Sequence, residues 1–311
     1  MNGSAQRRGV LEGHPSRALL SWPIRAQSFL SLAGGSIVGF AFLAVVLTST
    51  DSHAAQSLSE SNAVPPKIGI VYMHGTGSSP EMQHEKAFYG ALREAGYLVE
   101  TPEMCWSARR MYDRPYSDCM KAVPLAIAKL KNVGAMAIVV AGHSFGGNAA
   151  IQYGATHMDL LGVLVLSAAF DPRILARDWE VRASIAKAQG LIDKGRGDAV
   201  DSFLFTTAKV QLRTKATVYL SFNGPRSLAY MPANTPKLTA PLLWIAGDRD
   251  FGQPGPGYAF DKAPANPLNR YVAVSGNHVT VLSSGVEPVL AWLDELRRFV
   301  YAANEGKGML H

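Results

Sequence analysis

The sequence predicts an α/β fold in which helices cover both faces of a mainly parallel central sheet. Short, continuous apolar runs alternate along the chain with longer segments whose apolar residues recur at the period of an α-helix. Continuous apolar runs are typical of strands buried on both faces, which is the usual situation in parallel sheets. A hydrophobic content of 48% and only two cysteines in 311 residues exclude a disordered chain and a disulfide-stapled scaffold.

Each predicted element has local signals at its ends. Ser79, Pro80 and Glu81 supply a cap, a first-turn proline and an early acid for the first helix, and Gly96 ends it. In the last helix the apolar residues fall on one face, which can pack against a sheet. We expect strands at 67–74, 97–101, 135–141, 161–167, 241–246 and 270–274, and helices at 79–95, 119–132, 144–157 and 286–301.

One long interruption of this alternation is an insert at about 172–240. Within it we expect a helix at 172–194, a corner at Gly195 and Gly197, and a short strand or helix around 216–222. Such an insert either forms a substrate lid or pocket wall, or is an ordinary crossover helix followed by a surface loop.

The N-terminal 54 residues have the pattern of a leader that crosses a membrane. No charged residue occurs from 26 to 50, and residues 28–48 are apolar over about the 20 residues that a membrane span requires. Both a cleaved signal peptide, ending at 54, and an uncleaved membrane anchor fit this pattern. A linker at 55–66 then leads to the α/β domain at 67–303. Either alternative predicts export, to a periplasmic or secreted location, or attachment to the membrane through residues 28–48.

The net charge of +6 does not indicate a nucleic-acid partner. Arg7, Arg8, Arg17 and Arg25 against Glu12 place half of the surplus in the leader, where it orients a membrane segment. The remaining charges are scattered along the chain, and no RNA-binding or helix-turn-helix signature is present.

The two cysteines are 14 residues apart, at Cys105 and Cys119. Export would allow them to form a disulfide, and two buried free thiols are the alternative. Neither cysteine has partners at zinc-binding spacing, so we expect no structural metal.

The motif that indicates chemistry is Gly142-His143-Ser144-Phe145-Gly146, which matches G-x-S-x-G. The pattern alone is a weak signal. Here, however, it follows a predicted strand and precedes a predicted helix, the context that a nucleophile elbow requires.

With this motif in this context, the chain resembles the α/β-hydrolase fold superfamily from about residue 67 to 301. The resemblance implies a nucleophile, an acid and a histidine in that chain order, which gives Ser144, Asp250 and His278. A serine hydroxyl is a poor nucleophile until an imidazole accepts its proton, and a carboxylate fixes the imidazole tautomer. Asp171 and Asp248 are alternative acids, and His143 and His74 are alternative bases.

Other residues near the motif have expected roles in the same chemistry. The oxyanion formed by attack on a carbonyl needs two fixed N–H donors, and the resemblance points to the backbone of Thr76 and Phe145. His143, Trp106 and Tyr112 are candidates for the wall of a substrate pocket, with loop packing as the alternative for Trp106 and Tyr112.

The function that these residues predict is a serine hydrolase that needs no cofactor and acts on a small-molecule ester, thioester or amide. A carboxylic-ester hydrolase is favoured, and a peptidase is an alternative. An acyltransferase of the same fold would use the same residues. A non-catalytic binding protein that keeps the fold is a further alternative. The oligomeric state is not predicted.

Overall fold

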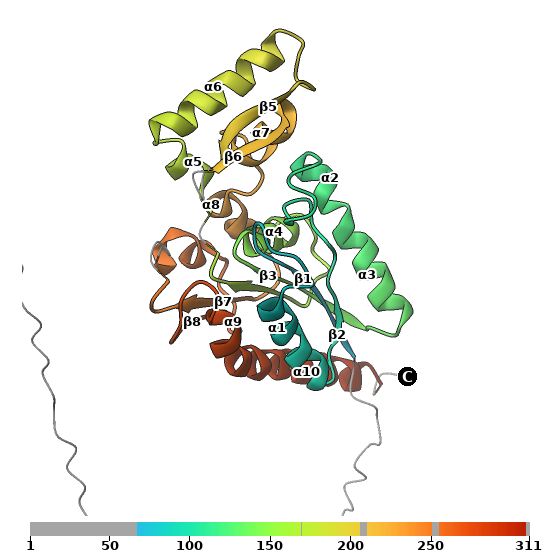
Figure 1. Cartoon of the computed structure of the whole chain (residues 1–311). Helices are drawn as coiled ribbons and strands as arrows, with labels where there is room; N and C mark the ends of the chain where they lie inside the picture. The colour runs from blue at the N-terminus through green and yellow to red at the C-terminus, as the bar shows by residue number, and fades with distance from the viewer. Residues whose placement is uncertain (1–66, 169, 206–209, 251–254, 309–311) are drawn as a thin grey trace, which may run out of the picture. The chain divides into compact units, whose positions relative to one another are not determined.

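Six parallel strands form the central sheet of the computed structural model, which describes residues 67–168, 170–205, 210–250 and 255–308 (Figure 1). The sheet has the strand order β2-β1-β3-β4-β7-β8, so the predicted fold class is confirmed. The strands are β1 (Ile68–Met73), β2 (Leu98–Glu100), β3 (Ala137–His143), β4 (Gly162–Leu166), β7 (Leu242–Gly247) and β8 (Arg270–Val274).

The strands alternate their side chains between two hydrophobic cores, one on each face of the sheet. In β1, for example, Ile70 and Tyr72 belong to one core, and Val71 and Met73 belong to the other. One face is covered by α1 (Gln83–Glu94), α9 (Val281–Ser284) and α10 (Val286–Gly308), and the other by α3 (Ala122–Asn132) and α4 (Phe145–Gly154). Burial on both faces explains why the strand sequences are apolar without interruption.

The parallel arrangement brings the loops that carry the predicted site residues to one edge of the sheet. The loops after β1, β3, β7 and β8 contain Thr76, Ser144, Asp250 and His278, and all of them leave the carboxyl ends of their strands. This is the edge at which ligands bind in parallel sheets.

Several predicted boundaries were wrong: the helix expected at 144–157 ends at Gly154, and the last helix continues to Gly308. For three others the local contacts give the reason. The third strand begins at Ala137, not at 135, because the Ala135 N–H caps the preceding helix by donating to Leu130 O at 2.9 Å. The first helix begins at Gln83, because Ser79 instead closes a turn in which its carbonyl oxygen accepts from the Met82 N–H. The second predicted helix is instead two helices, α2 (Tyr116–Met120) and α3. Pro124 has no N–H to donate to the carbonyl oxygen of Met120, so α2 does not continue into α3 without a break.

The insert between β4 and β7 contains more structure than the sequence predicted. Its first helix is divided into α5 (Pro172–Leu175) and α6 (Trp179–Asp193), because the Asp178 carboxylate starts a new helix by accepting from the Glu180 and Val181 N–H groups. An antiparallel hairpin of β5 (Val200–Phe205) and β6 (Val210–Lys215), which the sequence did not predict, follows. The remaining elements are α7 (Ala216–Asn223), α8 (Met231–Asn234) and the short 3-10 helix η1 (Thr235–Lys237).

Direct hydrogen bonds attach the insert to the sheet domain. The Thr214 hydroxyl donates to Tyr112 O at 2.8 Å, and the Tyr116 N–H donates to Ser221 Oγ at 2.9 Å. The Asn148 side chain, on α4, donates to both Phe170 O and Ala229 O at 2.8 Å. The loop after β2, α2 and α4 therefore all hold the insert and the segment that leads into it.

A disulfide joins Cys105 to Cys119, so the loop that follows β2 is tied to α2. Both cysteines are buried, and so are the large aromatic residues of the same loop. The segment 28–48 lies outside the described residues. Within the part of the chain that is described, no helix combines the length and the apolar character needed to cross a membrane.

We expect removal of this disulfide to destabilise the domain, because the crosslink restricts the unfolded chain. By the loop-entropy relation, a closed loop of this length contributes about 3 kcal/mol to the free energy of unfolding. Urea unfolding of the wild type should therefore show a lower midpoint with reductant than without it, and the double variant Cys105→Ala/Cys119→Ala should be insensitive to reductant. Equal midpoints for the wild type under both conditions would contradict the expectation.

Candidate active site

Ser144 lies at the apex of a tight turn between β3 and α4. Its φ of 53° and ψ of −122° lie in a region that residues with a side chain seldom occupy. A Cβ atom at Gly142 would lie 2.1 Å from the Gly146 carbonyl carbon, and a Cβ atom at Gly146 would lie 2.0 Å from the Met73 carbonyl oxygen. The turn therefore requires glycine at both positions, and it presses the start of α4 against the end of β1.

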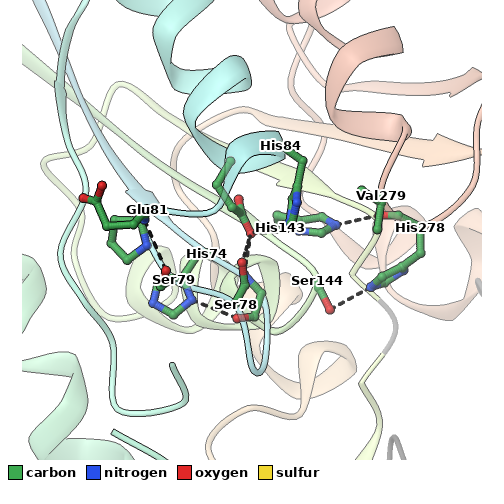
Figure 2. Close-up of polar contacts among 12 residues, drawn as sticks. His74, Ser78, Ser79, Glu81, His84, His143, Ser144, His278 and Val279 are labelled. Atoms are coloured by element: carbon green, nitrogen blue, oxygen red, sulfur yellow. Dashed lines mark hydrogen bonds and ion pairs between the residues drawn. The ribbon is translucent and has the colours of Figure 1, made fainter. Parts of the chain in front are cut away.

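Ser144, His278 and Asp250 form one chain of hydrogen-bonding groups at the carboxyl edge of the sheet. His278 Nε2 lies 2.9 Å from Ser144 Oγ, a contact that Figure 2 shows. On the other side of the ring, His278 Nδ1 lies 2.9 Å from Asp250 Oδ2. The Asp250 carboxylate can only accept at neutral pH, so the proton of a neutral His278 is held on Nδ1 and its Nε2 faces the serine hydroxyl. The Asp250 side chain is 7% exposed and that of His278 is 44% exposed.

The two alternative acids are placed elsewhere by the structure. Asp248 Oδ1 accepts from the Gly276 N–H at 2.9 Å and so shapes the loop that carries His278. Asp171 Oδ1 caps α5 by accepting from the N–H groups of Arg173 and Ile174. Neither carboxylate has a hydrogen bond to His278 among the described residues.

The two alternative bases are buried and bonded to other groups. His74 Nδ1 lies 2.8 Å from Gly75 O, and His74 Nε2 accepts from the Met104 N–H at 3.1 Å. Burial, partly offset by the bond to Gly75 O, lowers the pKa of His74. His143 Nε2 lies 2.7 Å from the carbonyl oxygen of His278. Of the three histidines, it is therefore His278 whose ring reaches Ser144.

Two backbone N–H groups belong to segments beside Ser144: Phe145 follows it in the chain, and the loop of Thr76 approaches it through Gly75. The Phe145 N–H is at the first position of α4, and the Thr76 N–H is in the loop after β1. Among the described residues, neither N–H has a hydrogen-bond partner. The Thr76 loop is held by neighbouring bonds, since the Gly77 N–H donates to Trp106 O at 2.8 Å and the Ala108 N–H donates to Ser78 O at 2.9 Å.

A fully buried carboxylate that the sequence analysis did not identify, Glu85, lies behind this loop. It accepts from the Tyr72 hydroxyl, from the Ser78 hydroxyl at 2.9 Å and from the Gly75 N–H at 3.2 Å, and His143 Nδ1 lies 3.4 Å away. Burial raises the pKa of Glu85, but the hydrogen bond and charge of His143, with the bonds from Tyr72 and Gly75, lower it to about 2. The carboxylate is therefore charged.

The sequence contained a signal for Glu85. The buried residues of α1 are Glu85, Phe88, Tyr89 and Leu92, which follow the helical period. An acidic residue on the apolar face of a helix is buried on folding and then needs hydrogen-bond donors or a cation beside it. The position of Glu85 on that face therefore indicates a specific role.

The aromatic residues expected to form a pocket wall are packed inside the domain. Trp106 and Tyr112 are 0% and 4% exposed. The Trp106 ring lies 4.9 Å from that of Phe145, and its Nε1–H donates to His74 O at 2.8 Å. Tyr112 packs against Phe222 of the insert, with ring centres 4.7 Å apart. These side chains therefore support the loops around Ser144 from beneath.

The described residues contain no group of three or more histidine, cysteine, aspartate or glutamate side chains arranged to hold a metal ion.

No protein-family model matches the sequence, and comparison with curated proteins finds no match. Solved structures, in contrast, are similar in fold. A structure reported for the metagenome-derived lipolytic enzymes LipS and LipT is 18% identical and covers 76% of this chain and 95% of its own, with a TM-score of 0.54. Est1E from Butyrivibrio proteoclasticus with bound ferulic acid is 19% identical, covering 78% and 91%, with a TM-score of 0.52. A monoacylglycerol lipase from Paleococcus ferrophilus is 20% identical, covering 73% and 94%, also with a TM-score of 0.52.

The chain thus has the α/β-hydrolase fold, as the resemblance of its sequence implied. Because one fold can carry many functions, and identities at this level show the fold alone, the function must be inferred from the site itself.

The packing around Gly146 predicts that Gly146→Ala destabilises the domain by about 3 kcal/mol or more, because the added methyl group overlaps the Met73 carbonyl. Gly190→Ala is the matched control. Gly190 lies within α6 and its Cβ would meet no atom within 4 Å, so alanine should stabilise that helix by about 0.5–1 kcal/mol. Urea unfolding measures both effects, and equal effects of the two substitutions would contradict the prediction.

The lowered pKa of Glu85 predicts a specific dependence of stability on pH. A carboxylate whose pKa falls from 4.5 to about 2 on folding stabilises the fold fully above pH 4.5, and this contribution is lost as the pH falls toward 2. In urea unfolding at a series of pH values across this window, Glu85→Gln should lose stability less steeply than the wild type. Glu94→Gln, at the exposed end of α1, controls for the loss of one carboxylate. Parallel curves for the wild type and Glu85→Gln would show the prediction to be wrong.

Proposed function

We propose that the protein is a serine hydrolase that cleaves a carboxylic ester through an acyl-Ser144 intermediate. The observation that supports this proposal most directly is the chain of contacts from Ser144 Oγ through His278 to Asp250, built at a strained turn. A surface serine has no need of a positive φ, an imidazole at 2.9 Å and a carboxylate behind that imidazole. A serine that attacks a carbonyl carbon needs the imidazole and the carboxylate, and in an elbow of this kind the strained turn exposes its Oγ.

In the proposed reaction, Ser144 Oγ attacks the carbonyl carbon while its proton passes to His278 Nε2. The Asp250 carboxylate stabilises the imidazolium that forms, and the N–H groups of Thr76 and Phe145 bind the oxyanion. The C–O bond of the ester then breaks, and His278 gives its proton to the departing alcohol. A water molecule, activated by His278, hydrolyses the acyl-serine and restores the free serine. No cofactor is required.

The structurally similar proteins support an ester as the substrate class. Those proteins are described as lipolytic enzymes, as a monoacylglycerol lipase and as Est1E with bound ferulic acid. We also propose that the domain works beyond a membrane. The disulfide supports this location, because such bonds are rare in reducing compartments, and residues 28–48 have the composition of an export signal or anchor.

A fluorophosphonate probe tests the nucleophile, because it reacts with a serine that is activated by a base. The wild-type chain should be labelled at Ser144, and Ser144→Ala should not be labelled. If the wild type remains unlabelled, or the alanine variant is labelled equally, then Ser144 is not an activated nucleophile.

The same assay tests the acid, with hydrolysis of p-nitrophenyl esters as a second measurement. Asp250→Asn should lower kcat by about 10³–10⁴-fold, because an amide no longer holds His278 in the required tautomer. Asp248→Asn and Asp171→Asn are matched controls, since asparagine keeps a carbonyl oxygen for the backbone N–H groups that these residues bind. A loss in either control as large as that in Asp250→Asn would reassign the acid.

A further inference from the structure

The two ring nitrogens of His143 both face hydrogen-bond acceptors. His143 Nε2 lies 2.7 Å from the carbonyl oxygen of His278, and a carbonyl oxygen can only accept. His143 Nδ1 lies 3.4 Å from Glu85 Oε1. Figure 2 shows the ring between the start of α1 and the loop that carries His278. A neutral imidazole has one N–H and one lone pair, so it satisfies only one of these two contacts.

Glu85 is an acceptor on both of its oxygens. Oε2 accepts from the Tyr72 hydroxyl, and Oε1 accepts from the Ser78 hydroxyl and the Gly75 N–H. Three donors converging on one buried carboxyl group favour its charged form. The proton between Glu85 and His143 therefore belongs to the imidazole.

His74 provides a contrast within the same site. Its Nδ1 faces the Gly75 carbonyl oxygen, whereas its Nε2 faces the Met104 N–H. One acceptor and one donor match the neutral ring.

Three further titratable groups lie near Glu85 and His143. His84 on α1 has its Nε2 3.7 Å from Glu85 Oε1 and its ring centre 6.4 Å from that of His143. The ring centre of His278 lies 5.1 Å from that of His143, and His74 is the third group.

We infer that Glu85 and His143 form a buried carboxylate–imidazolium pair that positions His278. His143 donates from Nδ1 to Glu85 and from Nε2 to the backbone carbonyl of His278. His143, which directly precedes the nucleophile Ser144, therefore fixes the backbone of the base, His278. This role rests on the proposed function, in which His278 is the base. Neither Glu85 nor His143 touches Ser144 Oγ in this scheme; both act through His278 and are positioning residues.

The pair also connects the two loops on either side of Ser144. Through Gly75 and Ser78, Glu85 holds the loop that carries Thr76, and through His143 it holds the loop that carries His278. His278 needs such a support because its side chain is nearly half exposed. A displacement of about 1 Å between base and nucleophile can lower a rate by about 100-fold.

The protonation state can be tested without any assay of activity. In full-length protein labelled with ¹⁵N in its histidine rings, both nitrogens of His143 should give signals of protonated nitrogen at about pH 7.5, at which an ordinary histidine is largely neutral. His143→Gln identifies the signals by removing them, and His157→Gln, which removes an exposed histidine in the loop after α4, is the control. An unprotonated His143 nitrogen under these conditions would overturn the charged pair.

The positioning role can be tested by comparing two substitutions of His143. Glutamine retains an N–H group that can reach the His278 carbonyl, whereas leucine retains bulk but no donor. We expect His143→Leu to lower kcat for p-nitrophenyl esters by about 10–100-fold with KM nearly unchanged, and His143→Gln to recover most of that loss. His157→Gln should behave as the wild type. If His143→Leu retains wild-type kcat, or if glutamine restores nothing, the positioning role is wrong.

Glu85→Gln gives a further measurement on a variant that keeps the shape of the side chain. Without the carboxylate charge, His143 should show one unprotonated nitrogen in the ¹⁵N spectrum; two protonated nitrogens would overturn the pair. Failure of the positioning role is distinct from failure of the proposed function. If the wild type does not react with the fluorophosphonate, the serine-hydrolase proposal fails, and the ¹⁵N spectra still decide whether the pair exists.

Discussion

The close contact of Gly146 with the carbonyl groups at the end of β1 is the constraint on which the site depends. It permits α4 to begin directly above the sheet, so that Ser144 is forced into a positive φ and projects from the carboxyl edge. The same contact brings the positive end of α4, with the Phe145 N–H, beside the loop that carries Thr76. A side chain at Gly146 would separate these two backbones, and the serine, the helix end and the loop would no longer share one small volume.

The three residues of the candidate site could be predicted from the sequence because each follows a predicted strand. Ser144, Asp250 and His278 each come shortly after an apolar run, and parallel strands place the residues that follow them at one edge. The strands themselves were recognisable because both of their faces are buried. The boundaries were less accurate, since an element ends where a particular hydrogen bond forms. Ala135, apolar and next to an apolar run, belongs to a helix cap and not to a strand.

What the sequence could not provide are the contacts between residues far apart in the chain. The helical pattern places Glu85 on the apolar face of its helix, but it does not show that Tyr72, Ser78 and His143 surround the carboxylate. Trp106 and Tyr112 follow a strand at the ligand-binding edge, where exposure would make them pocket residues, yet Phe145 and Phe222 cover them. The hairpin at 200–215 has a mixed polar pattern because it pairs outside the main sheet.

The position of β8 at the edge of the sheet has a consequence for how the site opens. Among the described residues β8 pairs with β7 alone, and its side chains are exposed or half-buried, whereas β3 is buried almost throughout. Local unfolding begins where few apolar contacts resist it. Hydrogen exchange should therefore be faster in β8, which leads to the loop of His278, than in β3, which leads to Ser144. Ser144 thus follows a buried strand and its partner histidine follows a largely exposed edge strand, so the position of His278 depends on contacts from other elements, such as that of His143 Nε2 with the His278 carbonyl oxygen.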